Sequence, residues 1–304
     1  MVAGSRDSAA TTVTGPLSHA DGVLGWSVGH ELRAPGEFEA LRSATLLQTV
    51  SAGVNHLPFD RIPPEVPIAS NAGAWAEPMA EHILALALAL AKHLPQRQAA
   101  LRRGRYDQMP PNLEIRGTTV PILGFGGIGQ AAATLFEAFG ARVHAVTRSG
   151  QTDRPVHAVG TLADLDAVLA SADIVVIALP LNRDTRGLIG ARQLGGMKPD
   201  AILINVARAA IIDEDALFDH LDRHPAFSAG LDVWWQEGGP GGVFATRRPF
   251  LDLPNVIGSP HNSANTAGSL VTALRQATSN LARALQGQPV HHLVNRADYI
   301  SSSS

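Results

Sequence analysis

The chain of 304 residues contains no cysteine. It therefore has no disulfide, no thiolate nucleophile and no thiolate metal ligand. Its twelve histidines are scattered, and none stands at zinc-site spacing from a second ligand motif. The sequence accordingly predicts a protein without a metal centre.

Long apolar runs are also missing. The longest, residues 83–91, is far shorter than the roughly 20 residues that a membrane-spanning helix needs. Residues 1–15 are rich in small and polar residues and lack the apolar segment of a secretory signal. We therefore expect a cytoplasmic protein without membrane spans.

Neither sign of charge dominates. Lysine and arginine number 24 against 27 aspartates and glutamates, which gives a net charge of -3, and no basic run stands out. This balance makes nucleic acid or an anionic membrane an unexpected partner and leaves small metabolites as the expected ligands. The length suits two domains, each with its own core.

What the sequence does contain is an alternation of strand-like and helix-like segments between residues 119 and 258. This alternation predicts an α/β fold with a parallel, doubly wound sheet. Pro121 is expected at the beginning of its strand, because inside a central strand it would remove a ladder hydrogen bond. The predicted strands lie near residues 120–124, 142–147, 173–179, 201–206, 228–232 and 255–258.

Three glycines, Gly124, Gly126 and Gly129, form the spacing G-x-G-x-x-G between the first predicted strand and a helix. The first glycine permits a tight turn, the second a close approach of the backbone to a pyrophosphate, and the third close packing of helix on strand. Free N–H groups at the helix start, near Gly127 and Ile128, would meet the phosphates. The stretch predicts a dinucleotide site.

The acidic residue that would bind the ribose of NAD is missing after the second predicted strand. Thr147, Arg148 and Ser149 stand there instead. Arg148 could pair with a 2′-phosphate, and the two hydroxyls could add donors. NADP(H) is therefore the preferred cofactor, and NAD(H) stays possible if Arg148 stacks on the adenine or points to solvent.

These segments predict two domains. The dinucleotide-binding domain would span residues 92–267, and residues 1–91 with 268–304 would form a smaller, discontinuous domain. Helices at 77–94 and 265–287 would cross between them, and the cleft would bind ligand. The first of these helices alternates leucine with alanine, as a strand would, but both are strong helix formers, so we expect a buried helix that is apolar on every side. Residues 301–304 are expected as a solvated tail.

Three later stretches, residues 204–214, 231–237 and 254–261, resemble in order and spacing the signatures of the D-2-hydroxyacid dehydrogenases. The resemblance runs from about residue 20 to 300. It implies a Rossmann cofactor domain, a flavodoxin-like substrate domain and a homodimer, with residues 81–91 and 102–106 near its interface. It also implies the reduction of a small 2-keto acid, such as glyoxylate or hydroxypyruvate, to a D-2-hydroxy acid.

The chemistry of that reaction explains the residue types in these stretches. Arg208, just beyond a strand end, would clamp the substrate carboxylate and carbonyl oxygen through its rigid fork of donors. His261 would be the acid in reduction and the base in oxidation. By the resemblance, Glu237 pairs with this histidine and favours the imidazolium. Asp232 would contact the nicotinamide end of the cofactor, or simply cap its strand end.

The resemblance adds further contacts. Backbone N–H groups in the loop Ala52-Gly53-Val54 would bind the substrate carboxylate, where glycine permits close approach. Trp75 would line the substrate pocket or have an ordinary packing role. We interpret His56 and His82 as structural or solvent-facing. The remaining expected cofactor contacts follow strand ends, at Leu179, Pro180, Thr185, Val206, Ala207 and Ser263.

Some features depart from the family pattern. The Gly53 loop comes early, as if one strand–helix unit were missing, which would leave the sheet short or dependent on a partner. Ala209 and Ala264 replace common glycines, and residues 238–240 replace a proline after Glu237. Other interpretations therefore stay open: a different substrate such as formate, phosphite or a phosphorylated hydroxy acid, a dinucleotide-sensing protein similar to the corepressors of this fold, or a disabled homologue.

Overall fold

The computed structural model describes residues 17, 20–26, 28–32, 34–109, 111–238 and 242–299. The contacts divide the chain into unit 1, Met1–Trp75 with Thr266–Ser304, and unit 2, Ala76–Asn265. The first expected domain boundary, after residue 91, thus lies after Trp75 instead. The expectations for segment 1–15 and for the tail 301–304 concern residues outside the described part of the chain.

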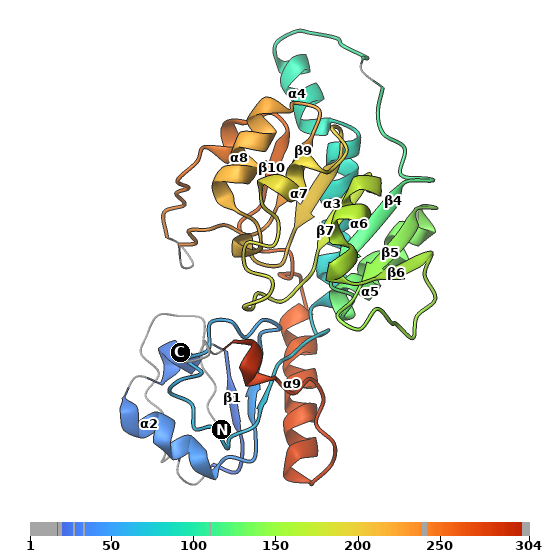
Figure 1. Ribbon diagram of the computed structural model, residues 1–304. Helices are drawn as coiled ribbons and strands as arrows, with labels where there is room; N and C mark the ends of the chain where they lie inside the picture. The colour runs from blue at the N-terminus through green and yellow to red at the C-terminus, as the bar shows by residue number, and fades with distance from the viewer. Residues whose placement is uncertain are drawn as a thin grey trace. The chain divides into compact units, whose positions relative to one another are not determined.

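Unit 2 contains a parallel sheet of seven strands, in the order β10-β9-β8-β7-β4-β5-β6 (Figure 1). Its apolar central strands are completely buried, as expected for strands covered on both faces. The predicted doubly wound fold is confirmed. The short edge strand β6 was not predicted. The strands are β4 (Thr119–Leu123), β5 (Arg142–Val146), β6 (Ala158–Gly160), β7 (Ile174–Ile177), β8 (Ile202–Asn205), β9 (Ser228–Leu231) and β10 (Val256–Gly258).

Helices pack on this sheet from residue 76 onward. The first of them, α3 (Ala76–Ala91), contacts α5 (Gly127–Ala138), β8 and β9, which is why it belongs to unit 2. One face of α3 is buried, but Ala85 is exposed, so the expectation of burial on every side is wrong. The other helices are α4 (Leu94–Arg102), α6 (Leu165–Ser171), α7 (Ala191–Gly195) and α8 (Glu214–Arg223), with 3-10 turns η3 (Leu162–Asp164), η4 (Ala209–Ile211) and η5 (Phe250–Asp252).

Pro121 lies in the middle of β4, and not at its beginning as predicted. The pairing of β4 with β7 begins at Ile122, one residue after the proline. The position of the N–H group that proline lacks thus precedes the ladder between β4 and β7. No hydrogen bond of that ladder is lost, so Pro121 destabilises the strand less than a proline inside the ladder would.

Unit 1 is a smaller α/β unit built from both ends of the chain. Its described strands form a parallel sheet in the order β1-β2-β3, and α9 packs on β1 and β2. Residues of the C-terminal segment continue the sheet edge, where Leu293 forms an antiparallel bridge with Ala69. The elements are β1 (Val23–Gly25), α1 (Val28–Glu31), α2 (Pro35–Glu39), η2 (Ala40–Ser43), β2 (Leu47–Thr49), β3 (Ile68–Ala69), α9 (Ser269–Leu285) and η6 (Arg296–Asp298).

Buried polar side chains hold the two chain segments of unit 1 together. The amide Nδ2 of Asn71 donates to the carbonyl of Ala273 at 2.9 Å, and Nδ2 of Asn280 donates to Oε1 of Gln48 at 2.7 Å. Such groups are costly to bury without partners, so these bonds specify how α9 docks on the sheet. Among the described residues, no helix has the length and apolarity to cross a membrane.

Candidate active site

The glycine-rich turn joins β4 to α5 in a geometry that only glycine permits. Gly124 has φ of +94°, and a Cβ atom there would lie 2.6 Å from the carbonyl oxygen of Ala178. A Cβ on Gly129 would lie 2.2 Å from the carbonyl oxygen of Gly124. The first and third glycines are thus required by the fold itself.

Gly126 differs from its two neighbours in the motif. It is the residue before the first turn of α5, and a Cβ atom built on it meets no protein atom within 4 Å. The space in front of the helix start is therefore open, beside N–H groups without intrahelical partners at Gly127 and Ile128. This arrangement fits the phosphates of a dinucleotide, since the helix N-terminus attracts anions.

The turn after β5 carries Thr147, Arg148 and Ser149. The hydroxyl of Thr147 accepts a hydrogen bond from the N–H of Gln151 at 3.1 Å, so this side chain shapes the turn. Arg148 and Ser149 are both exposed, and Thr147 is half-buried. In the described part of this turn, no acidic residue stands between Val146 and Gln151.

Arg208 lies in the loop after β8, and the side chain of Asn205 shapes that loop. Asn205 is completely buried; its Oδ1 accepts from the N–H of Ala207, and its Nδ2 donates to the carbonyl of Arg208, both at 3.0 Å. The guanidinium Nη1 donates to the carbonyl of Ala207 at 2.6 Å. Arg208 is half-buried.

His261 and Glu237 form a direct ion pair. Nδ1 of His261 lies 2.8 Å from Oε2 of Glu237, and both side chains are more than a third exposed. The second oxygen of Glu237, Oε1, accepts from the N–H of Trp234 at 3.0 Å. His261 has φ of +51°, an unusual value for a residue with a side chain. Because the carboxylate only accepts, Nδ1 carries a proton and Nε2 is left for exchange with a substrate.

Glu237 interacts electrostatically with both His261 and Arg208. Burial raises the pKa of its carboxyl, but the hydrogen bonds from His261 and Trp234, with the positive charges of His261 and Arg208, outweigh that effect and lower the pKa below its usual value. Glu237 is therefore ionised at neutral pH and accepts the hydrogen bond from Nδ1 of His261.

Asp232 is completely buried at the end of β9, and its carboxylate is used to hold the loop that carries His261. Oδ1 accepts from the hydroxyl of Ser259 at 2.6 Å and from the N–H of Asn262 at 3.1 Å. Oδ2 accepts from the N–H of Ser263 at 3.1 Å. A carboxylate has about four acceptor positions, so about one is left for a cofactor amide. Its link to the loop was not anticipated from the sequence.

Several other expected cofactor residues also follow the carboxyl ends of the strands. Thr185 is buried and donates its hydroxyl to the carbonyl of Pro180 at 2.6 Å, so it fixes the loop after β7. Because parallel strands end at the same sheet edge, these loops share that edge with the glycine turn. Leu179 and Pro180 follow β7, Val206 and Ala207 follow β8, and the buried Ser263 follows β10.

Apart from Arg208 and His261, the expected substrate-binding residues lie in unit 1. Ala52, Gly53 and Val54 follow β2, where the hydroxyl of Ser51 donates to the carbonyl of Gly53 at 3.0 Å. Trp75 is buried, and its indole N–H donates to the carbonyl of Val50 at 3.1 Å. Trp75 therefore supports this loop.

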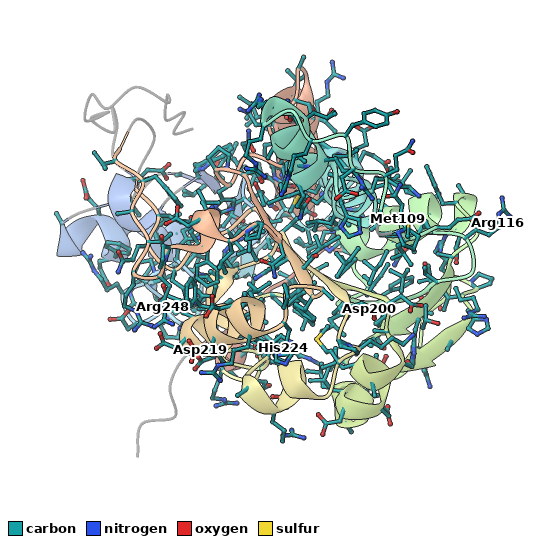
Figure 2. The ribbon with its side chains drawn as sticks, turned by 90° about the horizontal axis from the view of Figure 1, so that it is seen from above. Met109, Arg116, Asp200, Asp219, His224 and Arg248 are labelled. Carbon is teal, nitrogen blue, oxygen red and sulfur yellow. The ribbon has the colours of Figure 1, made fainter. Side chains whose placement is uncertain are left out.

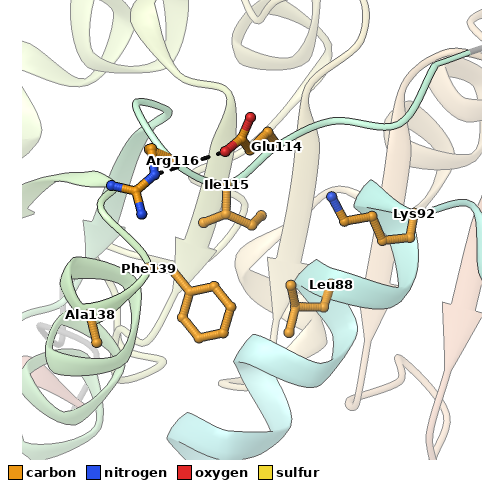
Figure 3. Close-up of a pocket in the computed structure, with 7 residues that line it drawn as sticks. All are labelled: Leu88, Lys92, Glu114, Ile115, Arg116, Ala138 and Phe139. Atoms are coloured by element: carbon orange, nitrogen blue, oxygen red, sulfur yellow. Dashed lines mark ion pairs between the residues drawn. The ribbon is translucent and has the colours of Figure 1, made fainter.

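Two further features of unit 2 lie outside this cluster of charged residues. Residues 239–241, part of the departure noted after Glu237, lie outside the described residues, but the following segment is anchored on α8. There Arg248 Nη2 donates to Oδ1 of Asp219 at 2.6 Å, and both residues are labelled in Figure 2. A pocket of about 290 Å³ lies elsewhere, between α3 and the end of α5 (Figure 3). It is lined by Leu88, Lys92, Glu114, Ile115, Arg116, Ala138 and Phe139, none of which is a candidate catalytic residue.

Comparison with known proteins places this geometry in context. Residues 84–263 match the model of the NAD-binding domain of D-isomer-specific 2-hydroxyacid dehydrogenases. Glyoxylate/hydroxypyruvate reductase B of Pectobacterium carotovorum is 32% identical to the chain over 285 residues, which are 92% of the chain and 87% of that protein.

Solved structures share the fold. A D-isomer-specific 2-hydroxyacid dehydrogenase from Xanthobacter autotrophicus, in complex with NADPH and MES, matches with a TM-score of 0.82 and 28% identity over 97% of this chain and 90% of that one. A D-lactate dehydrogenase from Lactobacillus jensenii, with NAD+, matches with a TM-score of 0.72 and 26% identity over 92% and 88%.

Proposed function

Because the chain belongs to the D-isomer-specific 2-hydroxyacid dehydrogenases and is thus an NAD(P)-dependent dehydrogenase, we propose that it reduces a small 2-keto acid, of the glyoxylate or hydroxypyruvate type, to a D-2-hydroxy acid. The observation that carries this proposal is the His261–Glu237 pair, close enough to Arg208 for the three charges to interact. Reduction of a carbonyl next to a carboxylate requires a cation and a proton donor of this kind.

Each of the three side chains has a part in the reaction. The bound nicotinamide cofactor supplies the hydride. Arg208 holds the substrate carboxylate and carbonyl oxygen with its guanidinium donors. His261 gives the proton on Nε2 to the carbonyl oxygen as negative charge develops there. Glu237 holds Nδ1 of the imidazole and stabilises its charged form before the transfer. In the oxidation direction, neutral His261 takes the proton back.

The cofactor would lie along the carboxyl edge of the seven-stranded sheet. The phosphates would meet the N–H groups at Gly126, Gly127 and Ile128, where the open space before α5 supports this placement. Asp232 would accept from the nicotinamide amide with its remaining acceptor position. The other proposed contacts are Gly124, Gly129, Leu179, Pro180, Thr185, Val206, Ala207, His261 and Ser263.

We propose NADPH as the preferred cofactor. Arg148 stands in the turn after β5 where an acidic residue would bind the ribose of NAD, and its charge favours a 2′-phosphate. Ser149 would add a hydroxyl donor. Thr147 would contribute less, since its hydroxyl already binds the backbone of Gln151.

In unit 1, the N–H groups at Ala52, Gly53 and Val54 are proposed to bind the substrate carboxylate, and Trp75 is proposed to support their loop.

For the assembly we propose a homodimer. Its interface would include α3, α4 and the segment after α4. Four large apolar side chains of α4 and that segment are more than half exposed, namely Leu94, Leu101, Tyr106 and Met109.

The reaction is tested by following the loss of reduced-cofactor absorbance with glyoxylate, hydroxypyruvate, pyruvate and bulkier keto acids. We expect turnover of the small keto acids, and a fall in kcat of about 10²- to 10⁴-fold in His261→Gln, since the variant lacks the proton donor. NADPH binding should change far less, because His261 is only one of many proposed cofactor contacts. His157→Gln, which changes an exposed histidine before β6, is the matched control and should keep its activity. Absence of turnover with every keto acid and both cofactors would contradict the proposal and favour a dinucleotide-sensing role.

The cofactor preference is tested by the same assay with NADPH and NADH side by side. Arg148→Ala should raise KM for NADPH by about tenfold or more and leave KM for NADH unchanged, because one charge-assisted contact is lost. Arg142→Ala is the control, because Arg142 begins the same strand β5 at its opposite end. Turnover with NADH alone would show that the preference is wrong.

A further inference from the structure

A chain of hydrogen bonds leads from α3 to the loop that carries His261. Nε2 of His82, in the second turn of α3, lies 2.9 Å from Oγ of Ser259. Oγ of Ser259 in turn lies 2.6 Å from Oδ1 of Asp232. Asp232 is completely buried, and the side chain of His82 is 26% exposed. The chain therefore runs through the interior of unit 2.

The direction of these bonds follows from the protons available. The Asp232 carboxylate already accepts from the N–H groups of Asn262 and Ser263, as an ionised carboxylate does. Ser259 has a single hydroxyl proton, and the 2.6 Å bond to Asp232 uses it. The contact with His82 can then form only if Ser259 accepts, so Nε2 of His82 must carry a proton.

Ser259 is also held through its backbone. Its carbonyl accepts from the indole N–H of Trp234 at 2.9 Å, and the backbone N–H of Trp234 binds Glu237. The segment around Ser259 thus stays in place without His82. What His82 adds is a second partner for the Ser259 hydroxyl, opposite to Asp232, with its Nε2 also 3.8 Å from Oδ1 of Asp232.

We propose that His82 is a positioning residue for the acid–base loop. By donating to Ser259 it directs the serine hydroxyl onto Asp232, and through Asp232 it fixes the N–H groups of Asn262 and Ser263 that follow His261. This inference rests on the proposed function, since its effect on rate requires His261 to be the proton donor. His82 contacts neither the substrate nor the proton that His261 transfers.

Two substitutions separate donation from simple packing. His82→Gln keeps an N–H donor at the position of Nε2, whereas His82→Met has a similar length and no donor. We expect kcat for the keto acid to fall about tenfold in His82→Met, because a buried charge-assisted hydrogen bond is weakened, and to return to within about twofold of the parent in His82→Gln. KM for the keto acid should change little, since Arg208 is held by another loop.

A double variant tests the path through the serine. If His82 acts through Ser259, then adding His82→Met to the Ser259→Ala variant should not lower kcat any further. Three results would each overturn the proposal. They are additive losses of kcat in the double variant, equal losses of kcat in His82→Gln and His82→Met, and full activity in His82→Met.

A second readout does not depend on turnover. The imidazole resonances of His261 are identified in NMR spectra by their loss in His261→Asn. They should shift in His82→Met and stay in place in His82→Gln, and the ring of His82 should show a proton on Nε2. An unshifted His261 in His82→Met would overturn the positioning role. A shift in a protein that reduces no keto acid would instead contradict the proposed function alone.

Discussion

The two oxygens of the Glu237 carboxylate have different partners, an imidazole on one side and a backbone N–H on the other. Because these partners bind the ionised form, the folded protein lowers the pKa of this group. A group with a lowered pKa in the folded state contributes stability that is fully present above its unfolded pKa, about 4.3. That contribution is lost as the pH falls through the lower native pKa.

We therefore expect Glu237→Gln to reduce the free energy of unfolding by a constant amount at neutral pH, and the difference from the parent to shrink below about pH 4. The side chain is more than a third exposed, so solvent screening keeps the difference at or below about 1 kcal/mol. Urea unfolding at a series of pH values measures it. Glu77→Gln, at an exposed position of α3, should show no such pH dependence. A difference that grows in acid would contradict the sign of the effect.

At the residue scale, the sequence predicts which residues belong to the site better than it predicts the hydrogen bonds between them. Arg208, Glu237 and His261 could be singled out because their types and spacing resemble a family. Nothing in the sequence links His82 to Ser259 or Asn205 to Ala207, because these contacts arise only when separate segments meet.

At the scale of elements, the turn from β4 into α5 depends on glycine for two different reasons. Gly129 has no room for a side chain, because a Cβ atom would lie 2.2 Å from the carbonyl oxygen of Gly124. A Cβ atom on Gly126, by contrast, would meet no protein atom within 4 Å. The same motif therefore combines a requirement of packing with a requirement of ligand binding.

The two requirements can be separated by two alanine substitutions. Gly129→Ala should lower the free energy of unfolding by about 1–3 kcal/mol, since β4 and α5 must move apart. Gly126→Ala should leave the unfolding midpoint almost unchanged but weaken NADPH binding, because its methyl group occupies the space proposed for the phosphates. Thermal unfolding with and without NADPH measures both effects. Equal destabilisation by the two variants would contradict this division.

Elements with strong apolar runs or motifs were predicted, and weak ones were not. The strands β7 and β8 are fully buried and were evident from composition, and the helix after the glycines follows from its spacing. The edge strand β6 has three residues with only one buried, so it carries no periodic signal. Pro121 was misplaced because the point where β4 begins to pair with β7 depends on the register of two distant segments.

At the scale of the whole molecule, the side chains of Leu94, Leu101, Tyr106 and Met109 form an apolar set around α4 and the segment after it. If this set lies in the proposed homodimer interface, light scattering should give about twice the chain mass of 31.9 kDa. Leu101→Asp should shift the protein toward the monomer, because a charge buried in an interface is costly. Val271→Asp, at an exposed position of α9, is the control and should leave the mass unchanged. A parent protein with the mass of a single chain would contradict the dimer.

The boundary between the units was expected after residue 91 from the sequence, whereas the contacts put it after Trp75. Residues 76–91 could belong to either unit by composition, since leucine and alanine suit any helix core. Packing on α5, β8 and β9 assigns them to unit 2. Only contacts between distant segments decide such a question.

The discontinuity of unit 1 has a consequence for synthesis. Unit 2 is one unbroken stretch, so it can complete its fold on the ribosome as soon as its last strand has emerged. Unit 1 must wait, because Asn71 and Gln48 find their partners on α9, and Ala69 finds its partner Leu293, only near the end of the chain. The segment of unit 1 that precedes unit 2 in the sequence therefore finishes folding after unit 2.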